Sequence, residues 1–154
     1  MIQIISARTE AHYQSARILF VQYAGTLGFD LEFQGFSREL ATLPGSYAPP
    51  RGCILLAEFN ANFVGCAALR PLESKICEMK RLFVVPEYRG RDIGRSLACS
   101  AIDRARQIGY EKMRLDTIES MKAANKLYLS LNFRTIQAYC YNPLENTNYM
   151  ELAL

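Results

Sequence analysis

Apolar residues recur along the chain with two different periods, and these periods predict the order of helices and strands. From Ile93 to Ile108 they recur every three or four positions, which is typical of one face of a helix. Gly109 follows as a C-terminal stop. Other helices are predicted from about Glu10 to Tyr23 with Thr9 as N-cap, from about Leu31 to Thr42, and from Ser120 to Leu131.

Short apolar runs between Gly, Pro and Asn residues predict strands. CILLAEF and FVGCAAL flank Asn60-Ala61-Asn62, which predicts a hairpin. The other predicted strands are IQIISA (2–7), CEMKRLFVV (77–85), MRLDTI (113–118), RTIQAYCY (134–141) and NYMELAL (148–154). The order of elements predicts an α+β fold, with helices packed on a mostly antiparallel sheet, in a single domain covering residues 1–154.

The composition and the net charge of the chain limit the partners, the location and the metal sites that we expect. Half of the residues are apolar, and a net charge of +3 is too small to favour nucleic acid as a partner. The chain begins with no basic-then-apolar leader and has no apolar run near the ~18 residues of a membrane span, so we expect a cytoplasmic protein without a membrane partner. The five cysteines contain no close pair, and His12 is the only histidine, so we expect reduced thiols and no metal site.

The stretch FVVPEYRGRDIGRSLA, residues 83–98, joins a predicted strand to a predicted helix through a turn rich in Gly and Arg. A helix N-terminus attracts anions, and Gly90 and Gly94 allow the backbone to approach a ligand closely. Arg89, Arg91 and Arg95 add cations. The turn therefore predicts a phosphate site, with a solvated strand-to-helix connection as the alternative. It is neither a Walker A nor a dinucleotide-binding motif.

Two motifs resemble those of one enzyme superfamily. The stretch CEMKRLFVVPEYRGRDIGRSLACSAIDRARQIGYEKMRLDT resembles the acetyl-CoA-binding core of the GNAT superfamily of N-acetyltransferases, and AANKLYLSLNF resembles its second signature. The resemblance implies a GNAT-like fold, with a mostly antiparallel mixed sheet of about six to seven strands and about four helices. It also implies transfer of acetyl from acetyl-CoA to a primary amine of a small molecule or peptide.

The resemblance also implies the site residues. Pantetheine would bond to the backbone of Leu82, Phe83 and Val84. The pyrophosphate would lie on the turn formed by Arg89, Gly90, Arg91, Asp92, Ile93, Gly94 and Arg95. Tyr128 matches the tyrosine that protonates the leaving thiolate, and Glu78 matches a catalytic glutamate that acts as base directly or through water; a water chain to solvent is the alternative to Glu78. Glu58, Glu73 and Asp116 are weaker candidates for the base.

This chain departs from the motifs at two positions. Asp92 replaces the central glycine, and a carboxylate ~4–6 Å from phosphate would cost roughly 1–3 kcal/mol of binding free energy. The alternative is that Asp92 caps the helix with its side chain toward solvent. Asn132 replaces the glycine before Phe133, and Asn tolerates the left-handed backbone that such a turn needs.

The sequence says less about the residues that would bind the amine acceptor. Residues 28–50 correspond to the family's variable region, where Phe29, Phe33, Phe36 and Tyr47 form either an aromatic wall or core. Tyr139, Tyr141 and the turn 141–149 would close the other side. Transfer of another acyl group, or a non-catalytic CoA-binding module, are the alternative functions. The apolar tail NYMELAL permits a homodimer through the late strands, which family members often form.

Overall fold

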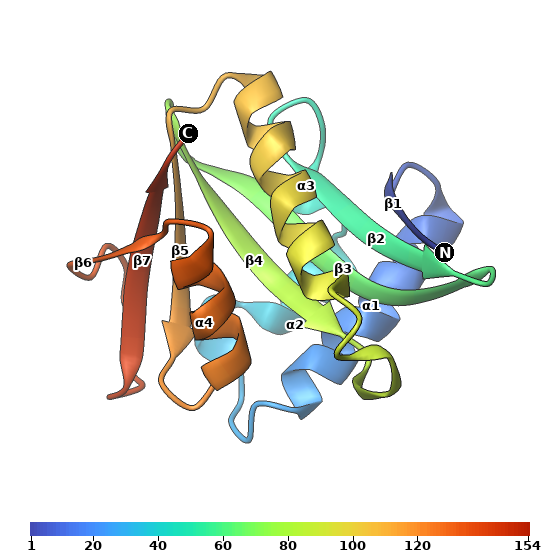
Figure 1. Ribbon diagram of the computed structural model, residues 1–154, viewed down its shortest axis with the longest axis horizontal. Coiled ribbons are helices and arrows are strands. Elements are labelled where there is room, and N and C mark those ends of the chain that lie inside the picture. The colour runs from blue at the N-terminus through green and yellow to red at the C-terminus, as the bar shows by residue number, and fades with distance from the viewer.

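The computed structural model describes residues 1–154, and one seven-stranded sheet runs through it (Figure 1). The strands are β1 (Ile2–Ser6), β2 (Cys53–Phe59), β3 (Asn62–Glu73), β4 (Ile76–Val84), β5 (Lys112–Ile118), β6 (Arg134–Ile136) and β7 (Thr147–Ala153). Their order across the sheet is β1-β2-β3-β4-β5-β7-β6. Only β4 and β5 pair in parallel; every other neighbouring pair is antiparallel. The predicted mixed, mostly antiparallel sheet is confirmed.

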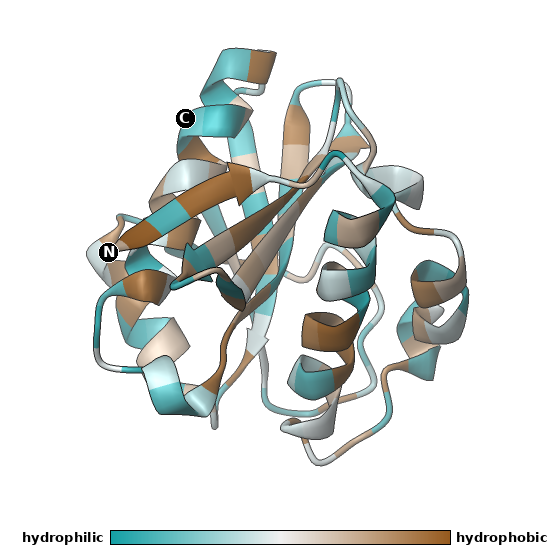
Figure 2. Cartoon of the chain, turned by 90° about the vertical axis from the view of Figure 1, so that its right-hand side faces the viewer, coloured by the Kyte–Doolittle hydropathy of each residue, from teal (hydrophilic) through white to brown (hydrophobic).

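Four α-helices cover the two faces of this sheet. They are α1 (Glu10–Gly25), α2 (Phe36–Ala41), α3 (Ile93–Ile108) and α4 (Lys122–Ser130). The helices α1 and α2 bury apolar residues against one face, and α3 and α4 against the other. Figure 2 shows the largely brown strands between the two helical layers, whose teal residues are polar. None of these helices is long and apolar enough to cross a membrane.

The structure confirms three of the predicted helices. The fourth is interrupted and does not form one continuous helix. The Thr9 hydroxyl caps α1 by accepting a hydrogen bond from the His12 N–H at 3.1 Å, as predicted. The helix predicted at 31–42 is broken at Gly35, whose φ of 71° is left-handed and ends a helical path. A 3₁₀ turn (Glu32–Gln34) precedes Gly35, and only the short α2 follows.

The predicted strands are present, but β3 continues to Glu73, four residues beyond the predicted run FVGCAAL. Asn60 and Ala61 have φ values of 50° and 65°, the left-handed backbone that a two-residue hairpin turn requires. The predicted strand 134–141 is too long, because pairing with β7 stops at Ile136. Beyond it the chain leaves the sheet, and the Tyr139 hydroxyl donates a hydrogen bond to Glu78 at 2.6 Å.

A bulge in β4 opens a gap in the sheet. Strands β4 and β5 pair only from Ile76 to Glu78, and the register between β3 and β4 then shifts. The shift leaves β4 with one extra residue, and Arg81 adopts a left-handed φ of 62° within it. Because a bulge bends its strand, β4 diverges from β5, as Figure 1 shows. Residues 79–84 therefore have no strand partner on the side that faces β5.

Candidate active site at the gap between two strands

Two cavities meet at the gap between β4 and β5. The larger, here called the outer groove, has a volume of about 810 Å³. The smaller, here called the inner cavity, measures about 40 Å³. The residues that line both are Tyr23, Leu27, Leu82, Ile118 and Met121. The gap therefore connects an elongated open site to a small and more enclosed one.

The outer groove collects almost every residue that sequence motifs assigned to the cofactor. Its walls are the end of β4, the turn into α3, and α4. The predicted residues that line it are Leu82, Phe83, Val84, Arg89, Gly90, Asp92, Ile93, Gly94 and Arg95. Arg91 is not among the lining residues, because its guanidinium lies over the rings of Tyr88 and Phe59, 5.4 and 5.7 Å from their centroids.

The N-terminus of α3 presents unpaired backbone donors to this groove. The first helical hydrogen bond runs from the Ser96 N–H to the Asp92 carbonyl at 3.0 Å, so the amides of residues 93–95 have no helical acceptor. Asp92 itself has a left-handed φ of 61°, which accounts for a glycine at this place in the motif. Asp92 is the N-cap residue of α3 and its side chain is exposed, as the alternative predicted, but that side chain makes no capping hydrogen bond. Asn132 keeps its turn as predicted, with φ of 75°.

Several cations surround the groove. Arg95 donates a hydrogen bond to the Ser130 hydroxyl on α4 at 2.9 Å. The Arg89 Nε donates to the Val84 carbonyl at 2.9 Å, beside the open edge of β4. Lys122 and Lys126 also line the groove, and the sequence reasoning missed them. Their spacing of four residues on one helix face was the available signal.

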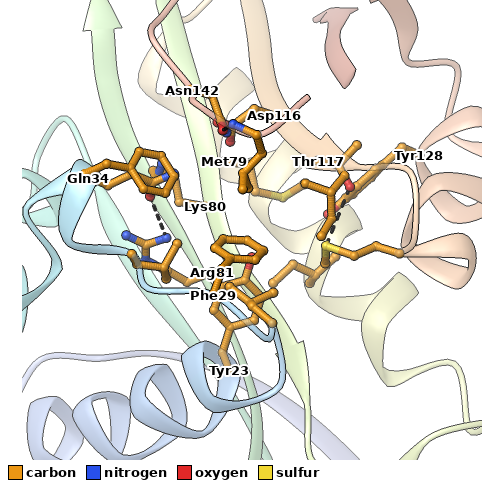
Figure 3. Close-up of a pocket in the computed structure, with 17 residues that line it drawn as sticks. Tyr23, Phe29, Gln34, Met79, Lys80, Arg81, Asp116, Thr117, Tyr128 and Asn142 are labelled. Carbon is orange, nitrogen blue, oxygen red and sulfur yellow. Dashed lines mark hydrogen bonds between the residues drawn. The ribbon is translucent and has the colours of Figure 1, made fainter. Parts of the chain in front are cut away.

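The inner cavity is assembled from segments far apart in sequence, and its polar side chains surround an aromatic centre. In Figure 3, Gln34 and Lys80 lie on one side and Thr117 and Tyr128 on the other, with Asp116 at the top. The lining residues also include Phe29, Phe33, Asn142 and Leu144.

The predicted aromatic wall is half present. Phe29 and Phe33 line the inner cavity, whereas Phe36 and Tyr47 are buried in the core between α1 and the sheet. Tyr141 is 78% exposed and lines neither cavity, although the turn that follows it contributes Asn142 and Leu144 to the inner cavity. Both regions that the sequence singled out for the acceptor therefore contribute to the inner cavity, but with fewer of their aromatic side chains.

Tyr128 presents its hydroxyl to the inner cavity. The residue is 6% exposed and its ring packs edge-on against Phe133, with centroids 5.7 Å apart. The hydroxyl has no hydrogen-bond partner in the protein, yet it is not among the fully shielded polar atoms, so it remains accessible from the cavity. Burial raises the pKa of the phenol, which keeps it protonated and able to donate.

Glu78 lies behind the inner cavity and lines neither site. It is 1% exposed, and both carboxylate oxygens are bonded: Arg70 donates to Oε1 at 2.7 and 2.8 Å, and Tyr139 donates to Oε2 at 2.6 Å. Burial alone would raise the pKa of Glu78, but the charges of Lys80 and Arg70 and the Tyr139 hydrogen bond outweigh it and lower the pKa. Such a carboxylate is well suited to anchoring its neighbours.

Arg81 fixes the segment that covers the inner cavity. Its guanidinium donates to both oxygens of Glu39 on α2, each at 2.9 Å, and to Gln34 at 3.0 Å. Arg81 is 4% exposed, so this ion pair is shielded from solvent. The bulge residue therefore links the bend of β4 to the position of residues 34–39.

Comparison with known proteins decides the family. The model of the acetyltransferase (GNAT) family matches residues 17–133. The chain belongs to the GNAT family of acetyltransferases. An uncharacterised N-acetyltransferase of Schizosaccharomyces pombe is 36% identical over 155 residues, which cover 99% of this chain and 95% of that protein. With the family model, this makes the chain an acyltransferase enzyme.

Solved GNAT structures share the whole fold. An acetyltransferase of the GNAT family from Staphylococcus aureus Mu50 superposes with a TM-score of 0.82 at 21% identity, covering 99% of both chains. The putative acetyltransferase yncA of Salmonella typhimurium, solved with acetyl-CoA, has a TM-score of 0.73 at 20% identity and covers 99% of this chain and 93% of that one. These similarities confirm the predicted GNAT-like fold.

Proposed function

We propose that this GNAT enzyme transfers an acetyl group from acetyl-CoA to the primary amine of a small molecule. The observation that carries the proposal is the meeting of the two cavities at the β4–β5 gap, with Tyr128 facing the inner one. Acetyl-CoA would supply an activated thioester. The volume of the outer groove suits a long ligand, and the 40 Å³ of the inner cavity suits a small acceptor better than a peptide.

The residues of the outer groove fit a CoA ligand. The unpaired edge of β4 at Leu82–Val84 offers backbone donors and acceptors to an amide-containing chain. The free amides at the start of α3 and the Arg95 guanidinium would hold the pyrophosphate. Lys122 and Lys126 would meet further phosphate charge along α4. Asp92 is the one carboxylate among the lining residues.

We assign the proton transfers to side chains that face the inner cavity. As the N–C bond forms and the C–S bond breaks, Tyr128 gives its proton to the leaving sulfur. The nitrogen loses two protons: one passes to the Asp116 carboxylate and on to solvent, and the other restores the Tyr128 hydroxyl. Glu78 is proposed as a positioning residue, since Arg70 and Tyr139 occupy its oxygens.

Two measurements test this function. Isothermal titration calorimetry with acetyl-CoA and with CoA should show binding of both. A thiol-release assay over a panel of small primary amines and short peptides should then show turnover with small amines, and faster release from acetyl-CoA than from longer acyl-CoA donors.

Each other outcome selects an alternative. Binding without release from any amine would identify a non-catalytic CoA module, and faster release from a longer acyl donor would identify a different transferase. The cytoplasmic location and the homodimer through β7 remain predictions.

A further inference from the structure

Lys80 is a buried cation without a partner. The residue is 7% exposed, and its ammonium makes no hydrogen bond and has no carboxylate within 4.0 Å. The other buried charged residues are both paired: Arg81 with Glu39, and Glu78 with Arg70. An ammonium group withdrawn from water costs several kcal/mol unless a counter-charge or hydrogen bond compensates it. The charge of Glu78 lies close enough to favour the charged form of Lys80, but no group of the protein bonds the ammonium directly.

The Lys80 ammonium can be reached from the inner cavity. Lys80 lines that cavity. The only fully shielded side-chain polar atoms without a partner are the Tyr47 hydroxyl and the Asn125 Oδ1, so the Lys80 Nζ is not sealed in the core. Burial lowers the pKa of Lys80, while Glu78 and Asp116 oppose that change. A ligand in the cavity that carried negative charge would supply the missing partner.

Asp116 places the opposite charge in the same cavity. Its carboxylate accepts only a long hydrogen bond, 3.4 Å, from Asn142. The Asp116 carboxylate and the Lys80 ammonium form no ion pair, so they lie more than 4.0 Å apart. One small cavity thus exposes an anion and a cation that do not neutralise each other by direct contact. That arrangement is complementary to a ligand with both charges.

We propose that the acceptor is a small aminocarboxylate, whose carboxylate binds Lys80 and whose ammonium binds Asp116. This inference rests on the proposed function and specifies the substrate class of the same site. The small size of the inner cavity favours the smallest members of the class, such as glycine or alanine. Asp116 then both binds the ammonium and receives its first proton.

Three matched acceptors test the inference: alanine, alaninamide and ethylamine, each with acetyl-CoA. We expect kcat/KM for alanine to exceed that for the other two by about 100-fold, because a charge-assisted contact in a buried site contributes roughly 1.5–3 kcal/mol. The amine of alaninamide is less basic than that of alanine, so a larger fraction of it is unprotonated at neutral pH. Amine basicity alone would therefore favour alaninamide, and a preference for alanine has to come from its carboxylate.

Two lysine variants complete the design. Lys80→Met should reduce kcat/KM for alanine about 100-fold more than it reduces kcat/KM for ethylamine. Lys112→Met is the control, since Lys112 is half exposed, lines neither cavity and should leave the preference intact. Thermal unfolding would check that both variants fold.

Equal use of the three acceptors, or an equal loss for all three in Lys80→Met, would overturn the inference. Calorimetry of alanine with CoA-saturated protein tests this inference separately from the proposed function. Alanine that binds the wild type but not Lys80→Met, without any acetylation, supports the site and rejects the transferase activity. Acetylation of other amines with no alanine binding supports the activity and rejects the site.

Discussion

The outer groove and the inner cavity share the β4–β5 gap but offer different chemical groups to a ligand. The groove offers backbone groups of β4 and α3 and a rim of cations, which suit any ligand with an amide chain and phosphates. The cavity offers side chains of both charges in a small volume. Donor binding should therefore tolerate side-chain changes that abolish acceptor selection. Substitutions on either side of the gap can test this separation.

The largest expected effect is on the inner side. Tyr128→Phe removes the hydroxyl that we assign to the leaving sulfur, so turnover should fall by about 10²–10⁴-fold, the usual contribution of a general acid. Affinity for acetyl-CoA should change little, because Tyr128 does not line the groove that would hold the pantetheine and the phosphates. Thiol release and calorimetry measure the two quantities.

The control for Tyr128→Phe is Tyr110→Phe. Tyr110 is also buried, and its hydroxyl donates to the Arg51 carbonyl at 2.6 Å, away from both cavities. This variant should lose some stability and keep its turnover. Unchanged turnover in Tyr128→Phe would remove Tyr128 from the mechanism.

Behind the cavity, Glu78→Gln should act on stability more than on chemistry. It leaves Arg70 without its counter-charge, and we expect a loss of about 2 kcal/mol in the free energy of unfolding, since Arg70 is partly exposed. Urea denaturation measures this loss, with Glu87→Gln as a control at a carboxylate that forms no ion pair.

The pH dependence of stability has a definite sign. The pKa of Glu78 is lower in the folded protein than in the unfolded chain. Its contribution to stability is therefore fully present above the unfolded pKa of about 4.3 and is lost as the pH falls through the folded pKa. Glu78→Gln should reduce this acid sensitivity. A variant of unchanged stability whose turnover no longer rises with pH would instead identify Glu78 as the base.

The two sides of the gap also differ in how far sequence could predict them. The groove residues from Leu82 to Arg95 are nearly contiguous, so a local motif names them together. The cavity joins residues near 29, 80, 116, 128 and 142, whose proximity depends on the bulge at Arg81 and on the sheet order. No local pattern reports such a juxtaposition. Lys80 accordingly looks like any strand lysine in the sequence, and its burial appears only in the fold.

The role of a side chain was hardest to predict where it depends on which other side chains bond to it in the fold. The sequence placed Glu78 on the correct strand, but only the fold brings Arg70 and Tyr139 to its oxygens. Gly35 shows the same limit for secondary structure, because a helical pattern on both sides of it conceals a left-handed residue that breaks the helix. In contrast, the ends of α3 follow directly from its apolar stripe and Gly109.

The smallest expected effect is in the groove, at Asp92. Asp92→Asn removes one negative charge beside the proposed phosphate site and should tighten acetyl-CoA binding about fivefold. This corresponds to about 1 kcal/mol, the low end of the Coulomb range, because the side chain is exposed to solvent. The effect should shrink as salt concentration rises. Calorimetry at two ionic strengths measures it.

Two further variants separate charge from backbone at this position. Asp92→Gly removes the charge and also relieves the left-handed φ of 61°, so it should bind acetyl-CoA as tightly as Asp92→Asn and unfold at a higher temperature. Asp103→Asn, at an exposed site on α3 outside the groove, should leave affinity unchanged. If Asp92→Asn also leaves affinity unchanged, the carboxylate points away from the phosphates and the groove tolerates even a charge of the wrong sign. Acceptor preference should be identical in all three variants, because the inner cavity contains neither aspartate.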